Sequence, residues 1–163
     1  MIVLGIDPGL ASTGWALVER SGSRLRALEC GTLRTSPRTA HAERLCALFD
    51  GVGAVLGRTQ VAGAAVESWF IHPVSKAAMG MAEARGALLV AIASAGVPVT
   101  EYPPTEIKLA VTGSGRAEKE QVRAMVSRLT GHIADTDHAA DAIAAAICHL
   151  HRQPLTAAIR NAQ

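Results

Sequence analysis

The chain begins with a run of aliphatic residues at 2–6 that is apolar on both faces and ends in an acid, Asp7. A strand without a polar face is typical of the covered centre of a sheet. The Asp7 carboxylate then emerges where the sheet is buried, and an unpaired charge there is costly unless a cation, a donor or a proton accompanies it. In the simpler interpretation, Asp7 only starts the turn at Pro8-Gly9 and caps its own backbone.

The same pattern recurs at 61–67 (VAGAAVE), where a second short apolar run closes with Glu67. If this strand lies beside the first and parallel to it, Glu67 and Asp7 emerge next to each other, because parallel strands end at the same edge of a sheet. The alternative is that Glu67 is a strand-end acid that faces solvent.

Alternation and turn residues predict three more strands, at 13–19, 24–33 and 97–102. Apolar residues at helical spacing predict helices at 37–58, 77–95, 105–111, 118–129 and 135–151. This order indicates an α/β fold with a five-stranded mixed sheet flanked by helices, in which the first three strands form an antiparallel meander. We expect one domain at 1–151 and a loosely ordered C-terminal tail at 152–163.

Composition narrows the class of protein. Hydrophobic residues fill 49% of the 163 positions but aromatic residues only 3%, which favours helices packed closely through alanine. The helix at 77–95 is apolar on nearly every face, and in so small a domain this indicates a subunit interface. The formal net charge is only +2, so any nucleic-acid site requires local clustering of cations.

The three cysteines, Cys30, Cys46 and Cys148, are scattered and show no pairing or metal-site spacing. Such usage fits a reducing cytosol. The sequence has no charged segment followed by an apolar run at its start, and no apolar stretch of transmembrane length. We therefore expect a cytoplasmic protein without a membrane partner.

Candidate chemistry gathers on the last predicted helix, where His138 and Asp141 are three positions apart and so share a face. With Asp7 and Glu67 they would converge from three elements, and a mostly oxygen donor set suits Mg²⁺ or Mn²⁺. Two such ions about 3.5–4 Å apart would activate a water and stabilise the leaving oxygen of a phosphodiester. Asp137, in the first turn, is explained more simply by the helix dipole.

Side chains suited to DNA lie near these acids. Trp69 and Phe70 follow Glu67 in a loop, where they either stack on bases or form a small core, and for Phe70 we favour stacking. Lys119 follows a Gly-rich loop, and its ammonium either neutralises a reacting phosphate or is simply solvated. Arg116 in that loop is a candidate contact to the DNA backbone.

Taken together, the chain resembles the RuvC family of bacterial Holliday junction resolvases, the crossover-junction endodeoxyribonucleases. The resemblance spans roughly residues 1–150 and rests on GIDPG at 5–9, VE at 66–67, EARG at 83–86, AEK at 117–119 and HAADAIA at 138–144. It implies a ribonuclease-H-like fold and a homodimer with two active sites. The activity it implies is metal-dependent, paired nicking of opposed strands at four-way DNA junctions during recombination and repair. Branch-migration partners, RuvA and RuvB, are implied by the resemblance alone.

The resemblance also implies roles for single residues. The family's acids correspond to Asp7, Glu67 and Asp141, its two basic positions near the scissile phosphate to Lys108 and Lys119, and its junction-contacting aromatic to Phe70. This chain departs from the family's pattern at one position: many members have Asp where this chain has His138. Imidazole is better matched to Mn²⁺ than to Mg²⁺, so our hypothesis is that His138 is a ligand, with a Mn²⁺ preference and activity lost as it protonates in acid. Alternatively, His138 only hydrogen-bonds a neighbour.

Two other classes of function stay open. A small ATP-binding protein related to actin-like kinases would use Asp7, Gly9, Thr13 and Gly14 as a phosphate loop, but such proteins enclose the nucleotide between two domains and this chain has one. A junction-binding protein without catalysis is the other alternative, and the presence of all three acids argues against it.

Overall fold

A five-stranded mixed sheet forms the centre of the molecule in the computed structural model, which describes residues 1–68 and 75–160. The strand order is β3-β2-β1-β4-β5. The strands are β1 (Ile2–Asp7), β2 (Ser12–Ser21), β3 (Arg24–Arg34), β4 (Gly63–Glu67) and β5 (Val99–Tyr102). The predicted α/β fold with five strands is confirmed.

Pairing of the strands brings the two strand-end acids together. Strands β1, β2 and β3 form the predicted antiparallel meander, in which Asp7 lies opposite Gly14. Strand β4 runs parallel to β1, with Val66 opposite Ile6, so Asp7 and Glu67 end the two strands at the same edge of the sheet. Strand β5 is parallel to β4. The parallel pairing that the sequence suggested for β1 and β4 is therefore confirmed.

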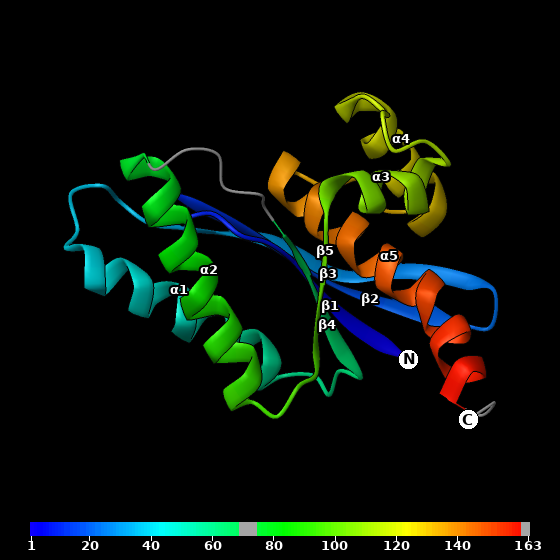
Figure 1. Cartoon of the computed structure of the whole chain (residues 1–163), viewed down its shortest axis with the longest axis horizontal. Coiled ribbons are helices and arrows are strands. Elements are labelled where there is room, and N and C mark those ends of the chain that lie inside the picture. Colours follow the sequence, from blue (N-terminus) through cyan, green and yellow to red (C-terminus); the bar gives the residue numbers. More distant parts are fainter. Residues whose placement is uncertain (69–74, 161–163) are drawn as a thin grey trace.

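Helices cover both faces of this sheet (Figure 1). On one face lie α1 (His41–Leu56) and α2 (Lys76–Ser94), and on the other α3 (Pro104–Thr112), α4 (Lys119–Thr130) and α5 (Asp137–Arg160). Each face has its own core: Leu48, Val52 and Leu88 are fully buried on the first, and α5 is buried from Ala142 to Leu150 on the second. A central strand covered twice explains why β1 is apolar on both faces.

Two glycines allow α5 to lie unusually close to the sheet. A Cβ atom at Gly5 would stand 1.9 Å from the carbonyl oxygen of Ala142, and one at Gly14 would stand 1.9 Å from that of His138. No side chain fits in these gaps. Glycine at both positions therefore allows the backbone of α5 to pack directly against β1 and β2. This contact places the first turns of α5 directly over the end of β1.

Two helix boundaries differ from the sequence prediction by more than two residues. Helix α1 begins at His41 rather than Pro37, because Ser36 holds a turn: its side chain accepts a hydrogen bond from the Arg38 amide, and its carbonyl accepts one from the Thr39 amide. Helix α5 continues past His151 to Arg160, since residues 155–160 are mostly strong helix formers. Most of the segment expected as a loosely ordered tail is therefore helical.

Helix α2 packs on α1 and keeps part of its apolar surface uncovered in the single chain, where Met79 and Val90 are 55% and 57% exposed. A role for this surface in a subunit interface stays a prediction. Within residues 1–68 and 75–160, no helix combines the length and the apolar character needed to cross a bilayer.

Candidate active site

The centre of the site is a hydrogen bond between β1 and α5. Asp7 is only 6% exposed, and its Oδ2 lies 2.6 Å from Nδ1 of His138. The turn after Asp7 is fixed by Thr13, whose hydroxyl donates to the Gly9 carbonyl at 2.7 Å. The side chain that leaves the buried strand is therefore paired with a polar group from the helix above it, as the cost of burying an isolated polar group requires.

Six of the predicted site residues line one cavity of about 560 Å³. They come from five elements that are distant in sequence: Asp7 from β1, Glu67 from β4, Lys108 from α3, Lys119 from α4, and His138 and Asp141 from α5. The structure places the predicted carboxylates and imidazole together, at the ends of the parallel strands. Ligand sites in open α/β sheets are typically found at this edge.

The acids of the cavity resist ionisation. Burial raises the pKa of Glu67 to about 8, and the nearby charges of Asp7 and Asp141 add to the rise. Burial also raises the pKa of Asp7, although the hydrogen bond with His138 opposes it, and the pKa of Asp141, although the charge of Lys119 opposes it. Carboxyl groups crowded in this way gain most from a bound cation.

Lys119 lies at the mouth of the cavity between two acids of α5. Its Nζ is 3.2 Å from Oδ2 of Asp137 and 3.7 Å from Oδ2 of Asp141. Arg123, one turn further along α4, contacts Oδ1 of Asp137 at 2.7 Å. Asp137 therefore does more than complement the helix dipole, which was the simpler of the roles that its position in the sequence allowed. The capping role belongs to Thr136, whose hydroxyl accepts from the Ala139 amide.

The residues around the cavity fit a divalent metal by the chemistry of their donor atoms. Three carboxylates and one imidazole are the donors that Mg²⁺ or Mn²⁺ takes in proteins. In the described part of the chain, however, no three His, Cys, Asp or Glu side chains stand close enough to hold one ion as they are. Asp7 faces His138 and Asp141 faces Lys119, so metal entry would exchange these two contacts for ligand bonds.

The remaining predicted residues lie elsewhere. Arg116 is exposed in the loop before α4 and does not line the cavity. Phe70, with its neighbour Trp69, lies outside the described residues. Sequence reasoning missed Arg123, although its spacing carried a signal: Lys119 and Arg123 are four apart on one helix, as are Asp137 and Asp141 on the next.

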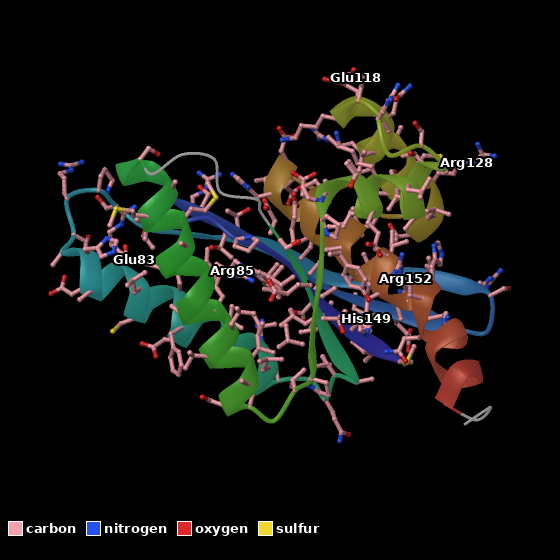
Figure 2. All side chains as sticks on the ribbon, in the orientation of Figure 1. Glu83, Arg85, Glu118, Arg128, His149 and Arg152 are labelled. Atoms are coloured by element: carbon pink, nitrogen blue, oxygen red, sulfur yellow. The ribbon has the colours of Figure 1, made fainter. Side chains whose placement is uncertain are left out.

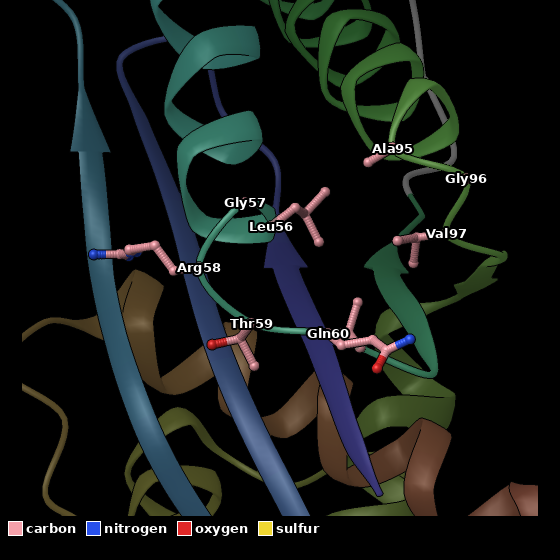
Figure 3. Close-up of a pocket in the computed structure, with 9 residues that line it drawn as sticks. Leu56, Gly57, Arg58, Thr59, Gln60, Ala95, Gly96 and Val97 are labelled. Carbon is pink, nitrogen blue, oxygen red and sulfur yellow. The ribbon is translucent and has the colours of Figure 1, made fainter.

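A second hollow, of about 460 Å³, lies at the opposite end of β4, between the ends of α1 and α2 (Figure 3). Its lining includes Leu56, Gln60 and Val97, and its one ionisable residue, Arg58, pairs with Glu29 at 3.4 Å. The lining of this hollow contains no acid, histidine or cysteine.

A buried polar group also lies away from the cavity, further along α5 (Figure 2 labels His149). The ring of His149, 5% exposed, has its Nδ1 2.9 Å from the Tyr102 hydroxyl and its Nε2 2.8 Å from Nε2 of Gln153. Burial lowers the pKa of His149. Because both ring nitrogens have partners, this group is satisfied and ties β5 to α5.

Comparison with known proteins assigns this chain to a family. The family described as "Crossover junction endodeoxyribonuclease RuvC" matches residues 3–149. The protein of that name from Chloroflexus aggregans is 46% identical over 157 residues, which cover 94% of this chain and 95% of the relative. The one from Mesorhizobium japonicum is 44% identical over 152 residues, 93% of this chain and 90% of the relative.

Solved structures give the same result. Thermus thermophilus RuvC superposes with a TM-score of 0.87 at 36% identity, covering 96% of this chain and 97% of the other. The same protein in complex with a Holliday junction substrate gives 0.89 at 35% identity, covering 96% of each chain. The ribonuclease-H-like fold predicted from the sequence is thereby confirmed. A chain matched over nearly its whole length by profile, sequence and structure belongs to the RuvC family of crossover junction endodeoxyribonucleases.

Proposed function

We propose that this protein resolves four-way (Holliday) DNA junctions by paired nicks in opposed strands during recombination and repair. The observation that carries the proposal is the gathering of Asp7, Glu67 and Asp141, from three elements, with two lysines at one cavity. The related Thermus thermophilus RuvC has been solved in complex with a Holliday junction as its substrate. One catalytic set per subunit suits a symmetric dimer, because a two-fold axis addresses two opposed strands at once.

We further propose that Asp7, Glu67, His138 and Asp141 hold Mg²⁺ or Mn²⁺, with two ions per subunit. Bound ions would activate the attacking water and neutralise charge on the phosphodiester. The support is the donor set itself and the raised pKa values of its carboxyl groups, which a cation would relieve. For the ions to bind, Glu67 must lose its proton and Asp7 must release its hydrogen bond with His138.

The lysines act on the DNA in this proposal. Lys119 is placed to neutralise charge that develops on the phosphate during attack, and Lys108 presents a second ammonium to the same cavity. Arg116, exposed in the preceding loop, would contact backbone without reading sequence. Phe70 is proposed to contact unstacked bases, on the resemblance alone.

His138 gives a metal-specific hypothesis. Imidazole favours Mn²⁺ over Mg²⁺, so wild-type protein should cut faster in Mn²⁺, and His138→Asp should reduce the ratio of the two rates. Equal wild-type rates in both metals, across their useful concentrations, would contradict the hypothesis.

The assembly and location of the protein are proposals of the same kind. We propose a homodimer, supported by the exposed apolar side chains Met79 and Val90 on α2, and partnership with RuvA and RuvB, supported only by family membership. A cytoplasmic location is supported by three free cysteines, Cys30, Cys46 and Cys148.

A labelled synthetic junction tests the nuclease proposal. Asp7→Asn and Glu67→Gln should bind the junction as wild type does and lose cutting by at least about a hundredfold, as expected when a charge-stabilising catalytic group is removed. Asp50→Asn, the same change at an exposed position of α1, is the control and should cut normally. Normal cutting by the Asp7 and Glu67 variants would overturn the assigned roles.

The same preparation separates the two alternatives. A junction-binding protein without catalysis would bind and never cut in any divalent metal. An ATP-binding protein would give heat on titration with nucleotide, which the nuclease proposal does not predict.

A further inference from the structure

Four charged side chains alternate across the seam between α4 and α5. Lys119 and Arg123 are one helical turn apart on α4, and Asp137 and Asp141 are one turn apart on α5. The contacts cross from helix to helix: Lys119 to Asp137 at 3.2 Å, Lys119 to Asp141 at 3.7 Å and Arg123 to Asp137 at 2.7 Å. Side chains four positions apart lie on the same face of a helix. The two basic side chains of α4 therefore face the two acidic side chains of α5.

Asp137 lies between Lys119 and Arg123, and each of its two carboxylate oxygens contacts one of them. Its Oδ2 takes Lys119 and its Oδ1 takes Arg123. The N-terminus of α5 also favours the anion. Asp137 is thus a negative charge held between two cations.

Lys119 would be poorly placed without such a partner. Its side chain is 52% exposed, and a lysine has four rotatable bonds that leave an unrestrained ammonium spread over many positions. Asp141, the cavity acid within reach of Lys119, is farther from its ammonium than Asp137 is, at 3.7 Å. Asp141 is also a proposed metal ligand, so it would be engaged by the ion when metal binds. Asp137 is therefore the partner that can keep the ammonium at the cavity mouth in every state of the site.

We propose that Asp137, braced by Arg123, is a positioning residue that holds the Lys119 ammonium at the mouth of the cavity, ready for the scissile phosphate. The inference rests on the proposed nuclease function. It adds to that function a residue that is neither a proposed metal ligand nor one of the two cavity lysines. Holding a charged group in place before the reaction removes an ordering cost from the transition state. Each contact is partly exposed, so the expected effect is a moderate one, about three- to tenfold on the rate of cutting.

Two other roles for Asp137 make different predictions. If it only starts α5, its loss lowers thermal stability and affects binding and cutting alike. If it only repels DNA, its loss tightens junction binding and leaves cutting equal or faster. A positioning role predicts slower cutting while junction binding is unchanged or tighter, because one negative charge near the DNA is removed.

Single-turnover cutting of a synthetic four-way junction, with binding measured separately by anisotropy without divalent metal, distinguishes these roles. Asp137→Asn should cut about three- to tenfold more slowly and bind no more weakly, whereas Asp137→Glu, which keeps the charge, should stay within about threefold of wild type. Glu120→Gln is the matched control: it removes an exposed acid from the first turn of α4 and should change neither quantity. Wild-type cutting by Asp137→Asn would overturn the proposal.

A spectroscopic test follows the ammonium itself. The chain has three lysines, Lys76, Lys108 and Lys119, so ¹⁵N-lysine labelling gives three ammonium signals, and Lys119→Arg identifies one of them. In metal-free, DNA-free protein, Asp137→Asn should shift the Lys119 signal and speed its exchange with water, and leave the Lys108 signal in place. A Lys119 signal unaffected by Asp137→Asn overturns the positioning role even if wild type cuts junctions. If wild type does not cut in any metal while the signal does respond, the nuclease function fails, and the role in it fails with it.

Discussion

Binding of metal to this site should release a proton from Glu67. Burial and the charges of Asp7 and Asp141 raise the pKa of Glu67 to about 8 in the metal-free protein. A carboxyl group must be ionised to hold a divalent cation, so binding is coupled to deprotonation. This coupling is tested by adding Mg²⁺ to the protein at different pH values.

The size of the coupling follows from that pKa. With a value of about 8, Glu67 is about 90% protonated at pH 7 and about 10% protonated at pH 9, so metal binding displaces about 0.9 proton at the lower pH and about 0.1 at the higher. The same protonation should weaken apparent Mg²⁺ affinity about tenfold at pH 7 relative to pH 9.

Calorimetric titration in buffers of different ionisation enthalpy measures the released protons directly. Wild type should show close to one proton at pH 7 that disappears toward pH 9, and Glu67→Gln should show none of this component. Mg²⁺ binding with no proton release at pH 7, and with equal affinity at pH 7 and pH 9, would show that Glu67 does not lose a proton when the metal binds.

The sign of the stability change provides a control that needs no metal. Because the pKa of folded Glu67 is raised above 4.5, the folded state keeps its proton longer, and the stabilisation this gives is full below pH 4.5 and lost as pH rises through about 8. Glu67→Gln should therefore unfold at a higher temperature than wild type at pH 9, with a smaller difference at pH 6.

Further predictions concern the packing that places the site. Gly14→Ala should lower the free energy of unfolding by about 2–4 kcal/mol, since the added Cβ would meet the His138 carbonyl oxygen at 1.9 Å, while Gly53→Ala, in open space on α1, should stabilise by about 0.5–1 kcal/mol in the same denaturant titration. Tyr102→Phe should cost about 1–2 kcal/mol, because the buried Nδ1 of His149 loses its partner. The lowered pKa of His149 means that stability is full above pH 6.5 and falls as pH drops below it; His149→Gln should flatten that part of a stability profile.

The acids of the site could be predicted because each is marked by a local pattern. Asp7 and Glu67 close short apolar runs, and the parallel pairing of β1 and β4 turns two similar strand ends into neighbours. His138 and Asp141 share a face by spacing alone. The close contact of α5 with Gly14 depends on which element packs there, and the sequence does not specify that element.

The ion pairs between helices could not be predicted, because they depend on how two helices cross. Asp137 at a helix start is explained most simply by the dipole until α4 is placed beside it with Lys119 and Arg123 on the facing side. Likewise, the contact of Tyr102 with His149 joins residues 47 apart and requires the position of α5 over β5. Such pairings are set by tertiary packing, which periodicity along one chain does not encode.

The decisive measurement is the location of bound metal in the protein. Crystals of the protein grown or soaked with Mn²⁺ should show anomalous density in the cavity, in contact with Asp7, Glu67 and Asp141, and this density should disappear in crystals of Asp7→Asn. Manganese bound only elsewhere on the chain, with the three carboxylates free of it, would contradict the account.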